Sequence, residues 1–360
     1  MNSARSGTTV REESIDNQKV LILENQELRI TVCPGQGATI LEILHRGTGE
    51  QLLWRAPGGL RDFGSSLQAE YDSSTSFFDF YSGGCQMILP NGGPSVRHGG
   101  VELGFHGEAC KIAWNYQIVE RNGEVTVICE TSLRRSPLDA KLSFTLTHHA
   151  SSVRIDAAVR NVSDQQVDLM WGFHPAYGES LTGPQTRLHI RAEDVEAHPE
   201  QFASKQILNP GFLGQWPIGP DGSRLDYLFD GNGATADLMY LKRIEGWYVI
   251  HNELTGLAAT MKWDNQVFPY VWLWQECRDH SGYPWFGRYH IVGVEPFTSY
   301  PSMGLEEAIR RGTAVQLAPR ATISTSLHIG ATQFVAQRNS VVAGVGDGGL
   351  VEFKSGVEDG

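Results

Sequence analysis

The chain has 360 residues, of which 29 are Lys or Arg and 41 are Asp or Glu, so its formal net charge is −12. This acidic balance, without a basic run interleaved with aromatic residues, argues against a nucleic-acid or anionic-membrane partner and favours an uncharged or weakly charged small ligand. No apolar run is long enough to span a bilayer and the first twenty residues contain no apolar signal segment, so we expect a cytoplasmic protein.

Short runs rich in β-branched and aromatic residues, separated by turn residues, predict an all-β fold. The opening strands are predicted at residues 19–24, 27–32 and 38–44. A tight turn is expected at Asn25-Gln26, because Asn tolerates a positive φ. Alternating apolar and polar residues predict a hairpin from residues 142–148 and 153–159. Later strands are predicted at residues 234–241, 247–251, 257–263, 270–274, 289–295, 314–317 and 322–329.

One short helix is predicted at about residues 303–311, with Ser302 as N-cap and Gly312 as the closing residue. No repeat or linker divides the strand-rich region, so residues 19–335 are predicted to form a single domain. Residues 1–18 are expected to be a loosely held tail. Residues 336–360 are expected to be a Gly-rich tail, with an edge strand at residues 350–353 as an option.

Several classes of chemistry lack their sequence signals. The five Cys residues are widely scattered and never spaced as C-x-x-C, so neither a disulfide framework nor a zinc ribbon is indicated. H-E-x-x-H, G-x-S-x-G and Walker A motifs are absent from the sequence, which argues against metalloproteases, α/β-hydrolases and P-loop enzymes. No metal ion is predicted, because no group of ligand residues has suitable spacing.

Two segments each place a proton-transfer residue near the end of an apolar run that stops at proline. Trp171–Tyr177 carries His174, and Val294–Pro301 carries Glu295. A carboxylate and an imidazole held by two rigid strands can take one proton from a substrate and give it another. A strand-capping His174 and a solvated Glu295 are the structural alternatives. The apolar residues before Glu295 favour a buried carboxylate instead, which is costly unless it is paired or used.

Three of the nine Trp residues, Trp272, Trp274 and Trp285, lie close to Glu295 in the sequence. Aromatic faces are what proteins offer to the apolar face of a sugar ring, although each of these residues could equally belong to the core.

Four short motifs, in order and approximate spacing, resemble the aldose 1-epimerase (galactose mutarotase) family. They are residues 104–108 (Gly-Phe-His-Gly-Glu), 171–177, 295–301 and 316–322, and the similarity spans most of residues 19–335. The resemblance implies a large twisted antiparallel β-sandwich that binds a sugar in an open cleft and needs no cofactor. It also implies an isomerase that interconverts α and β anomers by acid/base ring opening and reclosure.

By resemblance, Glu295 is the base that takes the proton from the anomeric hydroxyl, and His174 is the acid that protonates the ring oxygen. Ordinary pKa values would start Glu295 ionised and let His174 be protonated with little tuning, as these roles require. The predicted sugar contacts are His106, Asp226, Asn91, Arg97 and Tyr177.

The sequence departs from the family at residues 90–93, Pro-Asn-Gly-Gly, where glycine replaces a sugar-binding arginine. Arg97, four residues beyond Gly93, is the predicted substitute, with Arg288 as the second choice. Alternatively, the glycines leave space for a bulky or differently placed substrate group.

Two other classes of function stay open. A non-catalytic sugar-binding or sensing protein would use the same cleft without needing both an acid and a base. A glycoside hydrolase or lyase would need two carboxylates, and only Glu295 stands out, with Asp226 as a weak second. The identity of the sugar is open, and a homodimer is a further possibility.

Overall fold

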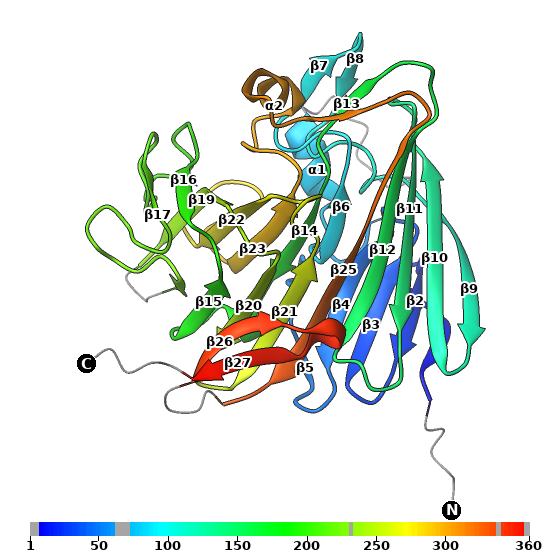
Figure 1. Ribbon diagram of the computed structural model, residues 1–360, viewed down its shortest axis with the longest axis horizontal. Coiled ribbons are helices and arrows are strands. Elements are labelled where there is room, and N and C mark those ends of the chain that lie inside the picture. The colour runs from blue at the N-terminus through cyan, green and yellow to red at the C-terminus, as the bar shows by residue number, and fades with distance from the viewer. Residues whose placement is uncertain (1–6, 62–72, 230–232, 336–339, 356–360) are drawn as a thin grey trace, which may run out of the picture.

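The computed structural model describes residues 7–61, 73–229, 233–335 and 340–355. In these residues two large antiparallel sheets, one of 12 strands and one of nine, dominate the fold (Figure 1). The prediction of an all-β sandwich is confirmed. None of the helices in these ranges is long and apolar enough to cross a membrane.

The 12-stranded sheet carries the candidate site at its centre. Along its hydrogen-bonded path its strands follow the order β1, β2, β3, β4, β6, β14, β23, β22, β19, β16 and β17, with β5 paired to β4. Their bounds are β1 Thr9–Ile15, β2 Gln18–Glu24, β3 Leu28–Cys33, β4 Thr39–His45, β5 Glu50–Gln51, β6 Cys85–Ile88, β14 Gly172–Tyr177, β23 His290–Phe297, β22 Tyr270–Cys277, β19 Thr235–Lys242, β16 Asp194–Ala197 and β17 Leu213–Gln215.

The nine-stranded sheet covers one face of the first. Its strands, in spatial order, are β18 Tyr227–Leu228, β15 Thr186–Ile190, β20 Trp247–Asn252, β21 Leu257–Trp263, β25 Thr322–Gln333, β12 Ser152–Asn161, β11 Leu138–Leu146, β10 Glu124–Ser132 and β9 Asn115–Arg121. Three small ladders pair β7 Val96–His98 with β8 Val101–Leu103, β13 Val167–Leu169 with β24 Val315–Leu317, and β26 Ser340–Val345 with β27 Val351–Ser355.

The two faces of the central strands bury different sets of residues. On β22, Val271 and Leu273 join the main core between the sheets, whereas Trp272 and Trp274 join a second, largely aromatic cluster on the other face. Because successive side chains of a strand point to opposite faces, this alternation follows directly from the sequence. The second cluster forms the surroundings of the candidate site.

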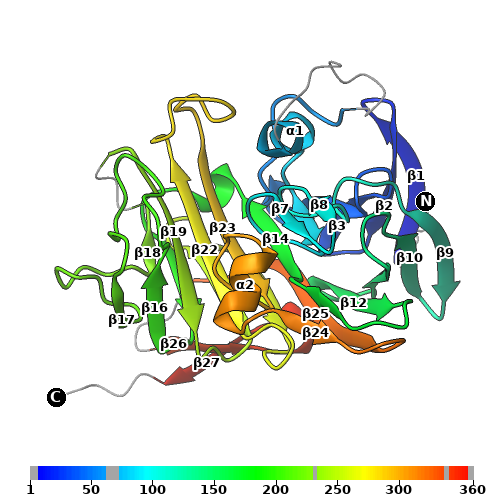
Figure 2. The same cartoon turned by 90° about the horizontal axis from the view of Figure 1, so that it is seen from above.

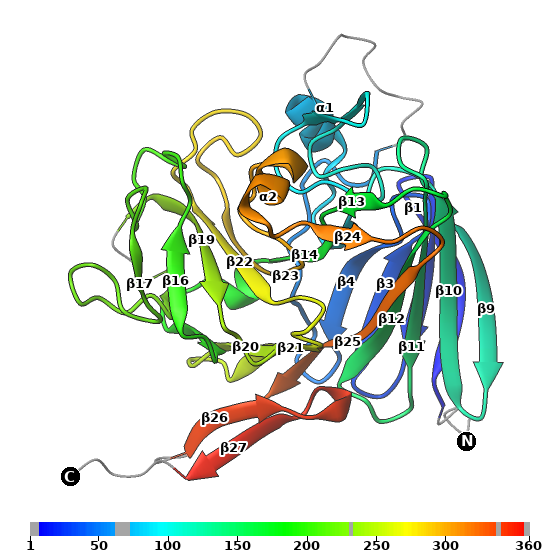
Figure 3. The ribbon, with the colours of Figure 1, turned by 45° about the horizontal axis from the view of Figure 1, so that its top comes forward.

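Two α-helices, α1 Ser73–Phe80 and α2 Leu305–Arg311, pack on this second face. They lie at the same end of the molecule, the upper end in Figure 1, which Figure 3 turns toward the viewer and Figure 2 shows from above. Two 3-10 turns, η2 Glu179–Leu181 and η3 Asp347–Gly349, complete the elements of the described residues.

The second helix partly matches its prediction. Gly312 closes α2 in the left-handed conformation, as expected, but the N-cap is Gly304 and makes no side-chain capping bond, so Ser302 as N-cap is wrong. The Asn25 turn also forms by another route. Asn25 does not have a positive φ. Its side-chain oxygen instead accepts hydrogen bonds from the backbone N–H groups of Glu27 and Leu28.

Both ends of the described chain are more ordered than expected. Thr9–Ile15, predicted as part of a loose tail, forms strand β1 and pairs with β2 along its whole length. At the other end Val351–Ser355 forms a hairpin with β26 rather than an edge strand of a large sheet. The remaining parts of the two predicted tails, residues 1–6, 336–339 and 356–360, lie outside the described residues.

Candidate active site

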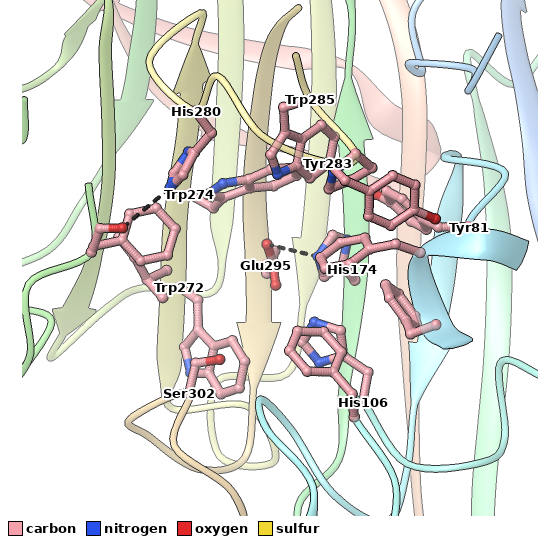
Figure 4. Close-up of a pocket in the computed structure, with 16 residues that line it drawn as sticks. Tyr81, His106, His174, Trp272, Trp274, His280, Tyr283, Trp285, Glu295 and Ser302 are labelled. Atoms are coloured by element: carbon pink, nitrogen blue, oxygen red, sulfur yellow. Dashed lines mark hydrogen bonds and ion pairs between the residues drawn. The ribbon is translucent and has the colours of Figure 1, made fainter. Parts of the chain in front are cut away.

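Glu295 and His174 come from neighbouring strands at the centre of the 12-stranded sheet. Ala176 on β14 lies opposite Gly293 on β23 in an antiparallel ladder. His174, two residues earlier, and Glu295, two residues later, therefore face the same side of the sheet. Nε2 of His174 lies 3.4 Å from Oε1 of Glu295 (Figure 4). The structure thus brings the two predicted proton-transfer residues together.

This pair lies in a pocket of about 320 Å³ whose wall is largely aromatic. All three of the singled-out Trp residues contribute. The aromatic side chains other than histidine are Phe77, Phe78, Tyr81, Phe105, Phe202, Trp272, Trp274, Tyr283 and Trp285. The polar lining consists of His106, His174, His280, Glu295 and Ser302, and Leu238 and Pro284 complete it. A concave, mostly apolar pocket with a few convergent polar groups is typical of a small-molecule site.

Burial controls the protonation of the pair. It raises the pKa of the Glu295 carboxyl well above its ordinary value and lowers the pKa of His174 to about 4. The pocket lining, within the described part of the chain, contains no Lys or Arg that would hold a carboxylate charge. Both shifts oppose the predicted starting forms, an ionised Glu295 and a protonated His174, in the free protein. Burial instead favours the uncharged forms of both side chains, with the titratable proton of the pair on Glu295.

His106 is positioned by its own backbone and by the loop that contains the glycine pair. It has a positive φ of 55° and is 7% exposed. Its Nδ1 accepts a hydrogen bond of 3.1 Å from the backbone N–H of Gly93. Burial, and then the neighbouring His174, lower the pKa of His106 well below its ordinary value. His106 is therefore neutral with its proton on Nε2, which makes it a hydrogen-bond donor.

Tyr81 is a pocket residue that the sequence analysis missed. Its ring centroid lies 5.9 Å from that of His174, and its buried hydroxyl has no hydrogen-bond partner among the described residues. Burial, followed by the charge of Glu295, raises the pKa of Tyr81 well above its ordinary value, so it is a neutral phenol. It follows the last turn of α1, a helix too short to leave a periodic signal in the sequence.

His280 was missed too, and it is already paired. Its Nδ1 contacts Glu276, whose side chain is fully buried, and its Nε2 lies 3.2 Å from the backbone oxygen of Phe202. The hydrogen bond to Glu276 raises the pKa of His280. Glu276 lies near the end of β22, four residues before His280, and this spacing gave no sequence signal.

Two predicted sugar contacts are turned away from the pocket. Tyr177 is three residues after His174, so it faces the other side of β14, where its hydroxyl bonds that of Tyr248 at 2.7 Å. Asp226 is occupied by ion pairs with Arg187 and Arg224, at 3.1 and 2.6 Å. Neither residue lines the pocket, so both predictions are corrected.

The other predicted contacts also have different partners. Asn91 is completely buried, where it donates to the backbone oxygens of Pro94 and Gly104 and accepts from the N–H of Leu305. Arg97 lies on the exposed hairpin formed by β7 and β8. The guanidinium of Arg288 lies 5.4 Å from the ring centroid of Tyr289, outside the pocket.

The glycine pair leaves no open space. A Cβ on Gly92 would lie 2.7 Å from the Trp272 ring, and a Cβ on Gly93 would lie 2.5 Å from the backbone of Ser302. The prediction that the missing arginine leaves room for a bulky substrate group is therefore wrong at this position. Trp272 and the 302–303 backbone occupy that room.

No group of three or more His, Cys, Asp or Glu residues in the described ranges could hold a metal ion. Glu295 is also the one carboxylate among the described residues that line the pocket. A glycoside hydrolase places two carboxyl groups on either side of the scissile bond, about 5–9.5 Å apart. The described residues of the pocket do not provide that arrangement.

Comparison of the sequence with protein-family models and with curated proteins gives no match. Solved structures do match. The chain is similar to a proposed aldose 1-epimerase from Klebsiella pneumoniae, with 14% identity and a TM-score of 0.67 over 89% of this chain and 83% of that one. It is similar to a galactose mutarotase-like protein from Clostridium acetobutylicum, with 13% identity and a TM-score of 0.62 over 92% and 100%. The Slr1438 protein from Synechocystis matches with 17% identity and a TM-score of 0.61 over 93% and 100%. The chain therefore has the galactose mutarotase-like fold.

Proposed function

We propose that the protein is an isomerase of the aldose 1-epimerase type, which interconverts the α and β anomers of a reducing sugar. One observation carries the proposal: a buried carboxyl and a buried imidazole whose reacting atoms are 3.4 Å apart, in a pocket walled by aromatic rings. The anomeric hydroxyl and the ring oxygen of a sugar are bonded to the same carbon. An acid and a base that act on both must therefore lie side by side, as His174 and Glu295 do.

The reaction moves one proton at each end of the breaking bond. One member of the pair accepts the proton of the anomeric hydroxyl while the other gives a proton to the ring oxygen, so the bond between C1 and the ring oxygen breaks and an aldehyde forms. Rotation about the C1–C2 bond presents the other face of the aldehyde. The two proton transfers then run in reverse and close the ring as the other anomer, which returns the pair to its starting protonation.

Each turnover needs a pair that carries one proton. In the free protein burial favours this proton on Glu295. The roles implied by the family resemblance, Glu295 as base and His174 as acid, require the proton to pass to His174 when the sugar binds. The opposite roles, with Glu295 as acid and His174 as base, need no transfer of the proton to His174. Both leave the number of protons on the pair unchanged, so the rate depends on single protonation in either case.

Two further groups support binding at the reacting end. His106 presents Nε2–H as a donor, and its ring centroid lies 5.4 Å from that of His174. Tyr81 offers its unpartnered hydroxyl from the other side of His174 in Figure 4. Donors fixed in place before the substrate arrives lower the cost of orienting it.

The test is the rate at which freshly dissolved single anomers equilibrate, followed by polarimetry or by NMR with and without protein. Glu295→Gln and His174→Asn should each lower the catalysed rate by about two to four orders of magnitude, the usual contribution of a positioned acid or base. Glu42→Gln and His189→Asn, which change the same residue types outside the pocket, are the matched controls and should keep the wild-type rate.

Wild-type rates in the Glu295 or His174 variant, with folding intact, would remove that residue from the mechanism. A protein that binds sugars but leaves their equilibration rate unchanged would be a sugar-binding or sensing protein, and the proposal of catalysis would fail.

A further inference from the structure

His106, His174 and Glu295 lie close together in the pocket, and most of the remaining wall is aromatic. His280 lies apart from them, beside Trp274, where it is paired with Glu276 (Figure 4). Figure 4 shows Glu295 and His174 at the centre with His106 below them, whereas Trp274, Tyr283 and Trp285 lie above. Ring centroids of Trp274 and Trp285 are 5.4 Å apart, and those of Phe78 and Trp285 are 5.6 Å apart. The pocket therefore has a polar end that suits one hemiacetal and an apolar end that suits a hydrocarbon surface.

The apolar end lacks the side chains that usually read sugar hydroxyls. Within the described residues, no Arg, Lys, Asp, Asn or Gln lines the pocket. Asn91 and Asp226 were expected to bind sugar hydroxyls. Asn91 instead forms hydrogen bonds with backbone groups, and Asp226 forms ion pairs with two arginines. A hydroxyl that leaves water for an apolar wall loses its hydrogen bonds without replacement, which disfavours a fully hydroxylated ring at this end.

The charge of the pocket also limits the ligand. Glu295 is buried without a cation among the described lining residues, and His280 is paired with the buried Glu276. A phosphate or carboxylate group on the sugar would find no unpaired cation among these lining residues. It would also lie near the acidic side chains of Glu295 and Glu276. An uncharged ligand fits this environment better.

We propose that the substrate is an uncharged reducing sugar that carries an apolar substituent, an ether or ester of an aromatic or alkyl group, and that this substituent lies against Phe78, Trp274 and Trp285. This proposal rests on the proposed anomer interconversion and names the class of sugar that undergoes it. The hemiacetal lies at Glu295 and His174, and the substituent replaces the hydroxyl contacts that the wall does not provide.

The aromatic wall is fixed before the substrate binds. The hydroxyl of Tyr283, on the loop between β22 and β23, donates to Oδ1 of Asp79 on α1 at 2.5 Å. The ring of Trp285 also lies 5.9 Å from that of Trp54. A wall held from both sides retains its shape, so an apolar group gains contact area without paying to order the loop.

The experiment compares parent sugars with their benzyl ethers. D-glucose, D-galactose and D-mannose, the 3-O- and 6-O-benzyl ethers of each, and each 6-phosphate are offered to the wild-type protein. Anomer equilibration gives kcat/KM, and quenching of Trp fluorescence gives Kd. We expect at least one benzyl ether to exceed its parent sugar by about 10–200-fold in kcat/KM, the usual range for an added apolar group in a fitted pocket, and each phosphate to be poorer than its parent.

The two measurements separate the two proposals. Parent sugars or phosphates that bind and react better than every benzyl ether would overturn the substrate class and leave the isomerase proposal intact. Benzyl ethers that bind more tightly than their parents, with no catalysed equilibration of any sugar, would support the ligand class and overturn the isomerase proposal. No binding of any sugar would overturn both.

A variant locates the substituent. Trp285→Leu keeps an apolar side chain but removes most of the aromatic surface, and should reduce the ratio of kcat/KM for the benzyl ether to kcat/KM for its parent sugar by about tenfold. Phe286→Ala is the matched control, because Phe286 is the next residue of the same loop, is 56% exposed and does not line the pocket. An unchanged preference in a folded Trp285→Leu protein would place the substituent elsewhere and overturn this location.

Discussion

At the scale of single residues, the chemistry of Glu295 depends on its position and on the lack of hydrogen-bond donors and cations among the described residues around it. The carboxyl is 2% exposed, and its Oε2 has no hydrogen-bond partner among the described residues. Charge on such a group is disfavoured until a ligand supplies donors. The same burial acts on His174 in the opposite direction, since it disfavours the protonated imidazole.

These opposite shifts predict a broad pH profile. Below a pH of about 4, His174 takes up a second proton and the pair has no base. Above the raised pKa of Glu295, the pair loses its one proton and has no acid. We expect kcat/KM for anomer equilibration to be level between these limits, with the acid limb near pH 4. An acid limb near 6.5, the ordinary pKa of histidine, would show that burial does not control His174.

Tyr81→Phe should separate activity from stability. Loss of the phenol removes one hydrogen bond to the substrate, worth roughly 0.5–1.5 kcal/mol, so kcat/KM should fall by about 2–12-fold. Stability should stay the same or rise, because the variant no longer buries an unpartnered hydroxyl.

Tyr177→Phe is the matched control for that experiment. Its hydroxyl bonds Tyr248 away from the pocket. Its removal should lower the melting temperature and leave kcat/KM unchanged. If Tyr81→Phe behaves in the same way as Tyr177→Phe, then Tyr81 has a structural role only.

At the scale of elements, the loop with Gly92 and Gly93 holds the loop with His106. The backbone oxygen of Gly93 accepts from the N–H of His106 at 2.9 Å, and the N–H of Gly93 donates to the imidazole at 3.1 Å. Gly93 has a φ of 87°, which side chains rarely adopt. One glycine of the pair that stands where the arginine was expected thus orients a pocket histidine and favours one of its tautomers.

Gly93→Ala should therefore damage both stability and binding. The left-handed backbone alone costs a non-glycine residue about 1–2 kcal/mol, and the new Cβ would meet the Ser302 backbone. We expect a lower melting temperature and a higher KM, because His106 shifts. Arg97→Ala, on the exposed β7, is the control and should change neither. A higher KM for Arg97→Ala would revive the first prediction that Arg97 contacts the sugar.

The elements also show what sequence reasoning could reach. The approach of His174 and Glu295 was predictable, because each ends a strand-like run and a shared sheet brings such positions together. The contacts of Asp226 with Arg187 and of Asn91 with Leu305 were not, since these partners are distant in the sequence. The sequence of a buried polar residue is also the same whether its side chain holds a ligand or a backbone group. The glycine pair was misread for a related reason, because Trp272 fills the space from another strand.

At the scale of the whole molecule, the C-terminal hairpin covers an apolar patch on the outer face of the nine-stranded sheet. Val342 and Val345 of β26 are buried against Trp247, Val249 and Ala258. In Figure 1 this hairpin, coloured red, crosses β20 and β21. Residues 340–355 of the predicted tail are therefore part of the packed structure, which the Gly-rich composition concealed.

Removal of residues 336–360 should destabilise the protein. Two buried valines at about 1.5–3 kcal/mol each amount to roughly 3–6 kcal/mol, and the exposed patch should promote association. Urea unfolding and light scattering measure the two effects. Removal of residues 356–360 alone is the control, since β27 ends at Ser355. Equal stability of the two truncated forms would show that the hairpin contributes nothing.

The proton-transfer residues of the pocket lie on sheet strands, whereas part of its aromatic wall lies on the segments that connect strands, and this difference matters for protein engineering. Glu295 and His174 are fixed by the ladder of β14 and β23, whereas Phe78, Tyr283 and Trp285 belong to α1 and to the loop between β22 and β23. The connections can be exchanged or randomised while the ladder stays as it is. A library confined to residues 73–80 and 278–289 would thus vary ligand choice while Glu295 and His174 stay in place, and it offers a compact starting point for variants of the proposed isomerase that act on sugars with new substituents.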